Sequence, residues 1–325
     1  MPARNYRRIA GIALCSLAVC VSVAAVPSGA PPAKPASDIE PLVQGTVHDA
    51  LFAASFDGAQ GIAAGAAGEL RTSSDGGKTW RTEKLDTQGL SLLGVAALGG
   101  RQIAVGQQGM VFTRADGAWT PGKSGTQQRL FSVAMHRSGL ALTVGAFGTL
   151  LRSTDAGANW SPVAFDWTEI LGEQVEPHLY AVDIDEAGVA TAVGEFGLVL
   201  RSTDGGEHWQ RVRKDEASLF GVQMRADGVG YAVGQSGSLL RSSDGGQSWQ
   251  ALKSGTGEIL LGVWSSGDTV VVAGMRELLA SRDGGQSWKL LKTGDLAPGW
   301  FAAATGSGDA VFAVGQYGRI VKIGG

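Results

Sequence analysis

A short hydrophobic pattern recurs seven times along the chain. Each copy has strand-length apolar runs on either side of a Val-Gly or Ala-Gly pair, and in most copies a second glycine follows three residues later. The first glycines are Gly65, Gly106, Gly145, Gly194, Gly234, Gly274 and Gly315, with spacings of 41, 39, 49, 40, 40 and 41 residues. A period near 40 residues is typical of propeller blades and of helical repeats. The many glycines and the lack of a sustained 3.6-residue period argue against helices.

The fifth copy gives the strand order within one unit. Apolar runs at 219–222, 231–233 and 239–242 predict three strands, and the segment around Trp249 predicts a fourth. The link at 234–237 predicts a tight hairpin, because glycine adopts the positive φ that such turns require. Four antiparallel strands form one blade. The sequence therefore predicts an all-β fold, a seven-bladed β-propeller.

The link between the third and fourth strands carries the most specific motif, Ser-x-Asp-Gly-Gly-x-x-Trp. Its Asp and Trp pairs are Asp75 and Trp80, Asp116 and Trp119 in a shortened copy, Asp155 and Trp160, Asp204 and Trp209, Asp244 and Trp249, and Asp283 and Trp288. The carboxylate can accept hydrogen bonds from N–H groups of its own turn, and the Trp covers the hairpin with a large apolar face. We interpret these residues as structural.

With these repeats the chain resembles the Asp-box, or BNR, repeat proteins. The longer pattern Ala-Val-Gly-x-x-Gly-x-Leu-Leu-Arg-Ser-x-Asp-Gly-Gly-x-x-Trp, present at 232–249 and in similar form at 192–209, resembles the photosystem II stability/assembly factor family. The resemblance covers nearly everything after residue 42. It implies a noncatalytic exported propeller that binds a membrane-protein client. The client would be photosystem II in a phototroph, and an envelope or transport complex in another organism.

The last copy lacks a fourth strand. It has strand patterns at 300–304, 311–314 and 319–323, and no Asp-box follows them. An unassigned apolar run at 42–47 precedes the first copy, and we expect it to complete the last blade. Such a closure removes the exposed inner sheet edges on which proteins aggregate.

Composition excludes some partners. The 325 residues include 27 Lys and Arg against 30 Asp and Glu, a formal net charge of -3, which provides no basic footprint for nucleic acid. The four histidines have no metal-ligand spacing, so we expect no metal and no cofactor. We expect a monomer.

The N-terminus has the pattern of a secretory signal peptide. Arg4, Arg7 and Arg8 precede an uncharged apolar segment at 9–23, and small residues follow at 23–25. A spanning helix needs about 20 apolar residues, but an uncleaved membrane anchor remains the alternative. We expect a signal peptide at 1–25, a Pro/Ala-rich linker at 26–41 and the propeller at 42–325. This predicts export to the periplasm, or to the thylakoid lumen in a phototroph.

Function is sought in departures from the repeat, because repeat residues already have a structural explanation. The 49-residue spacing adds nine residues to a 40-residue copy, between Trp160 and Leu179. We expect this insertion beside the hairpin tips, where Phe147, Phe196 and Trp167 would form an exposed aromatic partner surface. The alternative is that Trp167 packs onto its own blade.

A second feature is a set of cations at one repeat position. They are Arg152, Arg201, Arg241 and Lys322. In the assembly-factor family an arginine-rich patch is implicated in partner binding, and these positions match it if neighbouring blades gather them on one arc. The alternative is that each guanidinium packs between blades, which suits its planar, stacking chemistry. Tyr317, at a hairpin tip, is a further candidate contact.

BNR repeats also occur in sialidases, so a sialidase-like glycoside hydrolase or a carbohydrate-binding protein is the alternative function. A sialidase needs an arginine cluster and a Tyr nucleophile with a Glu partner. Tyr180 and Tyr231 occupy regular strand positions, so the sequence does not single out either as a nucleophile. A retaining glycosidase otherwise needs two carboxylates about 5 to 5.5 Å apart, for which Asp183 and Asp185, or Glu169 and Glu173, qualify only by sequence proximity. We predict that the protein is not an enzyme.

Overall fold

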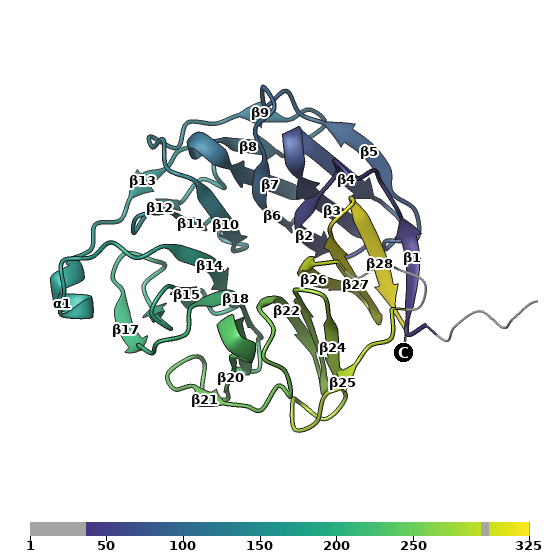
Figure 1. Cartoon of the computed structure of the whole chain (residues 1–325). Coiled ribbons are helices and arrows are strands. Elements are labelled where there is room, and N and C mark those ends of the chain that lie inside the picture. The colour runs from purple at the N-terminus through teal and green to yellow at the C-terminus, as the bar shows by residue number, and fades with distance from the viewer. Residues whose placement is uncertain (1–36, 294–298, 325) are drawn as a thin grey trace, which may run out of the picture. The chain divides into compact units, whose positions relative to one another are not determined.

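The structure, a computed structural model, describes residues 37–293 and 299–324. The predicted signal peptide, and the part of the predicted linker up to residue 36, lie outside the described residues. Seven four-stranded antiparallel sheets stand around one axis (Figure 1), which confirms the predicted seven-bladed propeller. Among the described residues the one α-helix is α1 (Trp167–Leu171), and three hairpins contain the single 3-10 turns η1 (Ala66–Gly68), η2 (Gln107–Gly109) and η3 (Gln235–Gly237).

Each blade starts beside the central axis and ends at the periphery (Figure 1). Blades 1 to 3 contain, in chain order, β2 (Leu51–Asp57), β3 (Gln60–Gly65), β4 (Glu69–Ser73), β5 (Arg81–Lys84), β6 (Leu92–Leu98), β7 (Arg101–Gly106), β8 (Val111–Arg114), β9 (Thr120–Pro121), β10 (Leu130–Met135), β11 (Ala141–Gly145), β12 (Leu150–Ser153) and β13 (Ser161–Pro162). Blades 4 to 6 contain β14 (Leu179–Ile184), β15 (Ala190–Gly194), β16 (Val199–Ser202), β17 (Gln210–Arg213), β18 (Leu219–Met224), β19 (Gly230–Gly234), β20 (Leu239–Ser242), β21 (Gln250–Ala251), β22 (Leu260–Ser266), β23 (Thr269–Gly274), β24 (Leu278–Ser281) and β25 (Lys289–Leu290). Blade 7 contains β26 (Phe301–Ser307), β27 (Ala310–Gly315), β28 (Arg319–Ile323) and β1 (Ile39–Val43).

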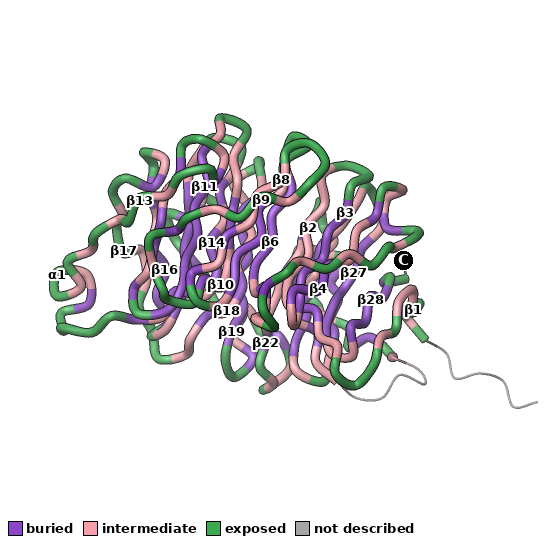
Figure 2. Tube along the Cα trace, turned by 90° about the horizontal axis from the view of Figure 1, so that it is seen from above, coloured by how far each residue is buried: buried purple, intermediate pink, exposed green. Residues whose placement is uncertain are grey.

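The hydrophobic cores lie between neighbouring blades. Every residue of β11, β15 and β19 is buried, because the adjacent sheets cover both faces of these second strands. Leu142 and Leu150 of blade 3 share one cluster with Leu200 of blade 4, for example. Figure 2 shows the buried positions running through the middle of the blades and the exposed ones gathered at the turns.

The first strands approach one another closely around the axis. A Cβ on Gly221 would lie 2.7 Å from the Leu261 carbonyl oxygen, and a Cβ on Gly262 would lie 2.8 Å from that of Ala302. Glycine is therefore needed at these two positions, because a side chain would collide with the backbone of the next blade.

β1 closes the ring. It pairs antiparallel with β28, with Ile39 opposite Ile323, and so supplies the missing outer strand of blade 7. The predicted range of this strand, 42–47, is displaced: β1 begins three residues earlier, inside the predicted linker, and Val47 is 75% exposed. The predicted linker included Pro41, but an outer edge strand tolerates proline because one of its sides needs no ladder hydrogen bonds.

Asp38 fastens the closing strand to blade 6. Its carboxylate accepts hydrogen bonds from Lys289 Nζ and from the Lys292 backbone N–H, both at 2.7 Å. The bond to Lys289 is the largest cause that lowers the pKa of this carboxyl. The closure thus joins the start of the described chain to two segments near its end, Lys289 and Lys292 beside blade 6 and β28 of blade 7.

Candidate functional site: the hairpin-tip face

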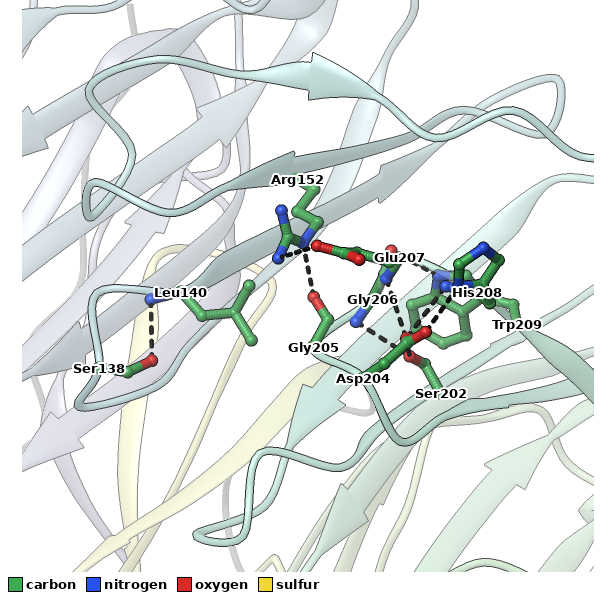
Figure 3. Close-up of polar contacts among 10 residues, drawn as sticks. All are labelled: Ser138, Leu140, Arg152, Ser202, Asp204, Gly205, Gly206, Glu207, His208 and Trp209. Carbon is green, nitrogen blue, oxygen red and sulfur yellow. Dashed lines mark hydrogen bonds and ion pairs between the residues drawn. The ribbon is translucent and has the colours of Figure 1, made fainter.

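The Asp-boxes are closed hydrogen-bond units. In blade 4, Ser202 Oγ donates to Asp204 Oδ1 at 2.8 Å and accepts from the Gly206 N–H at 2.9 Å, while the Trp209 indole donates to the Gly206 carbonyl at 3.1 Å (Figure 3). The backbone N–H of His208 is the largest cause that lowers the pKa of Asp204. The equivalent carboxyls have pKa values lowered to about 2, chiefly by side-chain hydrogen bonds; they belong to Asp75, Asp155, Asp244 and Asp283. These contacts are all internal to the turn and account for the motif structurally.

The shortened box of blade 2 is built differently. The Trp119 indole nitrogen is buried without a hydrogen-bond partner, and the Arg114 guanidinium lies over the Trp119 ring at 4.7 Å. Arg114 is also held by an ion pair to Glu83 at 3.0 Å. A cation–π contact thus takes the place of the missing turn bonds.

The candidate arginines connect blades instead of forming an exposed arc. Arg152 Nε donates to the Gly205 carbonyl at 2.7 Å, and its guanidinium pairs with Glu207 at 3.0 Å (Figure 3). Arg201 Nε donates to the Gly245 carbonyl at 2.7 Å in the same way. Each side chain therefore reaches from its own blade to the Asp-box of the next. Arg152 and Arg201 thus pack between blades, which was the alternative to an exposed arc. They do so because the repeat places each guanidinium opposite the neighbouring Asp-box.

The other two cations of the set differ from these. At the next blade interface the Tyr231 hydroxyl donates to the Gly284 carbonyl at 3.0 Å, and the Nε of Arg241 is buried without a partner. Lys322 is exposed on β28, opposite Glu40 of β1, and has no hydrogen bond or ion pair among the described residues. The four cations thus have three different environments and do not form a common patch.

The insertion lies at the periphery of blades 3 and 4. Asp166 caps α1 by accepting from the Glu169 N–H at 3.0 Å, and Lys214 Nζ beside β17 donates to the Leu171 carbonyl at 3.1 Å. Trp167 stacks on Phe165, with ring centroids 4.5 Å apart, and packs half-buried against the core between the two blades. Trp167 therefore takes the local packing role that was the alternative to a partner surface.

Phe147 and Phe196 lie at the tips of the hairpins between second and third strands. Both have positive φ, 53° and 58°, and both are exposed, by 57% and 39%. In the described chain no ring contact joins them to each other or to Trp167; the Phe147 ring instead meets the His178 ring, with centroids 4.9 Å apart. Trp167 nevertheless lies beside the first of these tips, because a Cβ on Gly148 would be 2.6 Å from its indole nitrogen, so a shared aromatic surface stays a prediction.

All seven hairpins place a non-glycine residue at this left-handed position. The tip residues are Ala67, Gln108, Phe147, Phe196, Ser236, Arg276 and Tyr317, and their φ values lie between 50° and 65°. A side chain at such a φ costs about 1 kcal/mol or more. The side chains at the tips are the ones that vary between blades, which makes this face the place to look for binding. Tyr317 is half-buried here under the Arg319 guanidinium, 4.8 Å from its ring.

Residues at the start of the first strands line the entrance of the central channel on this same face. Each first strand has a register shift next to its second residue, a β-bulge, and bulges re-aim a side chain. The second residues are Phe52, Leu93, Phe131, Tyr180, Phe220, Leu261 and Ala302. With Met275 and Trp300 they line a cavity of about 420 Å³, which we call the channel mouth.

A larger hollow opens beside the channel mouth, between the tips of blades 2 and 3. We call it the tip-face groove; its volume is about 690 Å³, and its lining residues are Leu90, Gln107, Gln108, Gln127, Gln128, Arg129, Phe131, Ala146, Phe147, His178 and Tyr180. Phe131 and Tyr180 line the channel mouth as well, so the two hollows are continuous. The Tyr180 ring lies 5.6 Å from that of Phe131 and 5.0 Å from that of Phe220.

The groove is lined by polar as well as apolar side chains. His178 Nδ1 accepts the Phe147 backbone N–H at 3.0 Å, which leaves the proton of the neutral ring on Nε2. Glu195 accepts the His178 N–H at 2.8 Å and the Tyr180 hydroxyl at 3.4 Å. Arg129 is exposed and has no hydrogen bond or ion pair from its side chain within 37–293 and 299–324.

Two of the glycosidase candidates, Tyr180 and Asp183, have raised pKa values. Burial, and secondarily Glu195, raises the pKa of Tyr180, so its phenolate is disfavoured. Asp183 lies half-buried between blades, where its carboxylate accepts the Met224 N–H at 2.7 Å, and desolvation of the carboxyl raises its pKa to about 7. Among the described residues that line the groove and the channel mouth there is no Asp and no Glu.

Neither a metal centre nor a membrane-spanning helix is indicated in the described part of the chain. Asp204, Glu207 and His208 place potential metal ligands within 4.8 Å of one another, but all three are exposed and bonded within the Asp-box or to Arg152. No helix in the described ranges has the length and apolar character needed to cross a membrane.

Sequence reasoning did not single out Phe52, Phe131 or Phe220, and it treated Tyr180 as a regular strand residue. A signal was present, because a buried residue directly precedes each of them and already supplies the core contact: Leu51, Leu130, Leu179 and Leu219. A large apolar residue beside a filled core position indicates a second apolar surface. The bulge that aims it at the channel has no signature in the sequence.

Comparisons with known proteins agree with this architecture. Residues 111–222 match the family described as photosynthesis system II assembly factor YCF48, which confirms the resemblance found in the sequence. No curated protein matches the chain. Among solved structures, YCF48 bound to a D1 peptide is 21% identical with a TM-score of 0.70, covering 89% of this chain and 98% of that one. YCF48 from Cyanidioschyzon merolae is 18% identical with a TM-score of 0.68, covering 89% and 99%.

A propeller of an enzyme is similar in fold as well. The GH74 xyloglucanase from Xanthomonas campestris is 16% identical with a TM-score of 0.70, and the match covers 89% of this chain and 54% of that one. At these identities the likeness of all three structures concerns the fold alone.

Proposed function

We propose that this chain, whose residues 111–222 match the photosystem II assembly factor family, is a noncatalytic scaffold that binds a membrane-protein client on its hairpin-tip face. The observation that carries the proposal is the continuity of the tip-face groove with the channel mouth through Phe131 and Tyr180. Large apolar side chains left half-exposed in a concave surface mark a partner site, and aromatic anchors supply most of the binding energy at such sites.

The solved propellers add support for a polypeptide ligand. One of them, 21% identical to this chain, is YCF48 bound to a D1 peptide. A groove of about 690 Å³ has room for a short extended segment. In a phototroph the proposed client is photosystem II, and in another organism it is an envelope or transport complex.

A noncatalytic role is supported by the chemistry of the lining. Glycoside hydrolysis commonly requires a pair of carboxylates around the scissile bond, and none of the described residues lining the two hollows carries a carboxylate. Turnover of fluorogenic glycosides by the purified protein, abolished by Glu195→Gln, would contradict the proposal.

Site-specific photocrosslinking tests client binding in the native host. We would place p-benzoylphenylalanine at Phe147, in the groove, and as a control at Gln247, which is exposed in an Asp-box turn at the opposite end of the blades. We expect a discrete crosslink to a membrane protein from position 147 and none from position 247. Equal labelling from both positions, or none from 147, would overturn the proposal.

We also propose that the protein is exported, which places the scaffold on the same side of the membrane as its client. The support is the charged and apolar pattern at 4–23. Cell fractionation and the intact mass of the purified protein test this. A cytoplasmic protein that retains residues 1–25 would contradict it.

A further inference from the structure

We infer that the tip-face groove and the channel mouth recognise an extended polypeptide segment that carries a large apolar side chain and, two residues from it, an acidic side chain. This inference rests on the proposed function and specifies the chemistry of the client segment.

The apolar requirement comes from the channel mouth. Nine side chains line it, and the polar groups among them are the Tyr180 hydroxyl and the Trp300 indole N–H. The Tyr180 hydroxyl already donates to Glu195, so the ring face is what remains for a ligand. The stacked pair of Phe52 and Trp300, 5.7 Å apart, extends the apolar wall on the side of blades 1 and 7. Such a cavity gains free energy by taking up an aliphatic or aromatic side chain and rejects a charged one.

The acidic requirement comes from Arg129. Its guanidinium is exposed in the groove without a partner in the described chain, whereas Arg152, Arg225 and Arg276 each pair with a carboxylate. A planar guanidinium binds a carboxylate through two parallel hydrogen bonds. The groove lining has no acidic residue to compete for it, so the charge is complementary to an acidic ligand.

The polypeptide backbone is matched by amide side chains. Gln108, Gln127 and Gln128 line the groove, and their side-chain amides have no hydrogen bond in the parts of the chain that the structure describes. Each amide offers both a donor and an acceptor, the pair of groups that an extended backbone presents. Three amides beside an apolar mouth suit a peptide better than a lipid tail.

The spacing follows from the chain geometry. Arg129 precedes Phe131 by two residues, so their Cα atoms lie at most about 7 Å apart. An extended ligand has the same rise per residue, about 3.3 Å. A side chain seated against Phe131 therefore places the residue two positions away level with Arg129. A spacing of one residue would turn the acidic side chain to the opposite side of the ligand.

Synthetic peptides test this directly. Fluorescein-labelled ten-residue peptides of Gly, Ser and Gln would carry a central Phe-Ser-Asp or Asp-Ser-Phe, because the structure does not fix the chain direction. Control peptides replace the Phe by Ser or the Asp by Asn. We expect fluorescence polarisation to show that one of the two orders binds, that loss of the Phe weakens binding about 30-fold, and that loss of the Asp weakens it about fivefold.

A charge exchange identifies the cation. Arg129→Glu should weaken the acidic peptide about tenfold and strengthen a peptide with Lys in place of Asp. Arg137→Glu is the matched control, because Arg137 is an equally exposed arginine at the opposite end of blade 3 and should leave both affinities unchanged. Melting temperatures of both variants verify that they fold.

The outcomes separate this inference from the proposed function. Crosslinking of a client from position 147 without dependence of peptide binding on the Phe, the Asp or Arg129 would overturn the inference alone. Absence of peptide binding at millimolar concentration would overturn it as well. Tight binding of an uncharged oligosaccharide at the channel mouth, with no client crosslink, would overturn both.

Discussion

The two faces of the propeller use the same repeat in opposite ways. On one face the Asp-box turns satisfy their own polar groups, as Ser73, Asp75 and Trp80 do within blade 1, and the second box glycine packs flat on the preceding blade. On the other face the tip residues vary from Phe to Arg, and Arg129 and three glutamines keep unpaired polar groups. Hydrogen bonds that close within a turn leave nothing for a partner, whereas unpaired groups around an apolar hollow do.

The difference shows why the motif that is most visible in the sequence is not the candidate site. Asp-box residues recur because each blade needs the same turn. At the hairpin tips only the backbone conformation repeats from blade to blade, and the side chain differs. The repeat therefore does not determine which residue stands at each tip, and that choice can follow function. Stability changes should therefore concentrate on the Asp-box face and at the blade interfaces, and binding changes on the tip face.

The largest effect should come from the closing strand, on which both faces depend. Deletion of Asp38–Val43 removes the partner of β28 and exposes an unpaired sheet edge. We expect loss of the cooperative thermal transition measured by circular dichroism. Val47→Asp is the control, because this residue was expected in the strand but is exposed. An unchanged melting temperature after the deletion would contradict closure by β1.

Within the Asp-boxes, Trp249 is the most deeply buried tryptophan, 8% exposed. Trp249→Ala should lower the free energy of unfolding by about 3 to 5 kcal/mol, the usual cost of emptying a large aromatic site. Urea denaturation measures this value. A loss below about 1 kcal/mol would show that the box does not hold its blade.

Asp183 makes stability depend on pH. Burial raises its folded pKa to about 7 from 3.8, so the unfolded chain ionises first as pH rises, and stability falls between about pH 4 and pH 7. The fall is about 4 kcal/mol at most for a shift of this size. Asp183→Asn should remove this pH dependence and stabilise the protein at pH 8. The expected gain is about 3 kcal/mol, less than the full fall, because the amide has one acceptor oxygen fewer than the carboxylate.

Urea denaturation at pH 4, 6 and 8 compares Asp183→Asn with the wild type. The Asp-box carboxyls have lowered pKa values and act in the opposite direction, since their contribution is lost as pH falls below about 4 towards 2. Equal slopes of stability against pH above pH 4 in both proteins would show that Asp183 does not stay protonated.

Substitution of one arginine at a blade interface and one on the tip face compares how much each region contributes to stability. Arg201→Met leaves the Gly245 carbonyl without its donor and should cost about 1 to 2 kcal/mol. Arg129→Met removes no side-chain hydrogen bond or ion pair within 37–293 and 299–324, and should change stability by less than about 0.5 kcal/mol. Chemical denaturation of the two variants side by side tests the assignment, and a reversed order would contradict it.

The smallest stability effect should be that of Phe147→Ser. Phe147 is 57% exposed and belongs to none of the core clusters formed by the described residues, so we expect a change within about 0.5 kcal/mol. Binding of an apolar dye such as bis-ANS to the groove should nevertheless decrease. Unchanged dye fluorescence would show that Phe147 is not part of an apolar binding surface.

The sequence predicted the fold well and the site poorly. Seven glycines in one register and the Asp-box motifs identified blades, strand order and hairpins, and the missing last strand indicated the closure. The position of that strand shifted to Ile39–Val43, because the pairing of Ile39 with Ile323 is a long-range contact that local hydrophobicity does not reveal. Phe147 and Phe196 were correctly placed at the hairpin tips, but their neighbours were not predictable.

By itself, then, the sequence determined the repeating unit, since turn geometry, glycine positions and apolar alternation are local properties that each copy carries in full. Only the tertiary structure decided where side chains of different copies meet. It turned Arg152 and Arg201 toward the next blade, packed Trp167 onto its own, and used a bulge in every first strand to gather Phe52, Phe131, Tyr180 and Phe220 at one channel entrance. The physical reason is that a ring superimposes equivalent positions from copies some 40 residues apart, and such a juxtaposition is a property of the closed ring that no single copy contains.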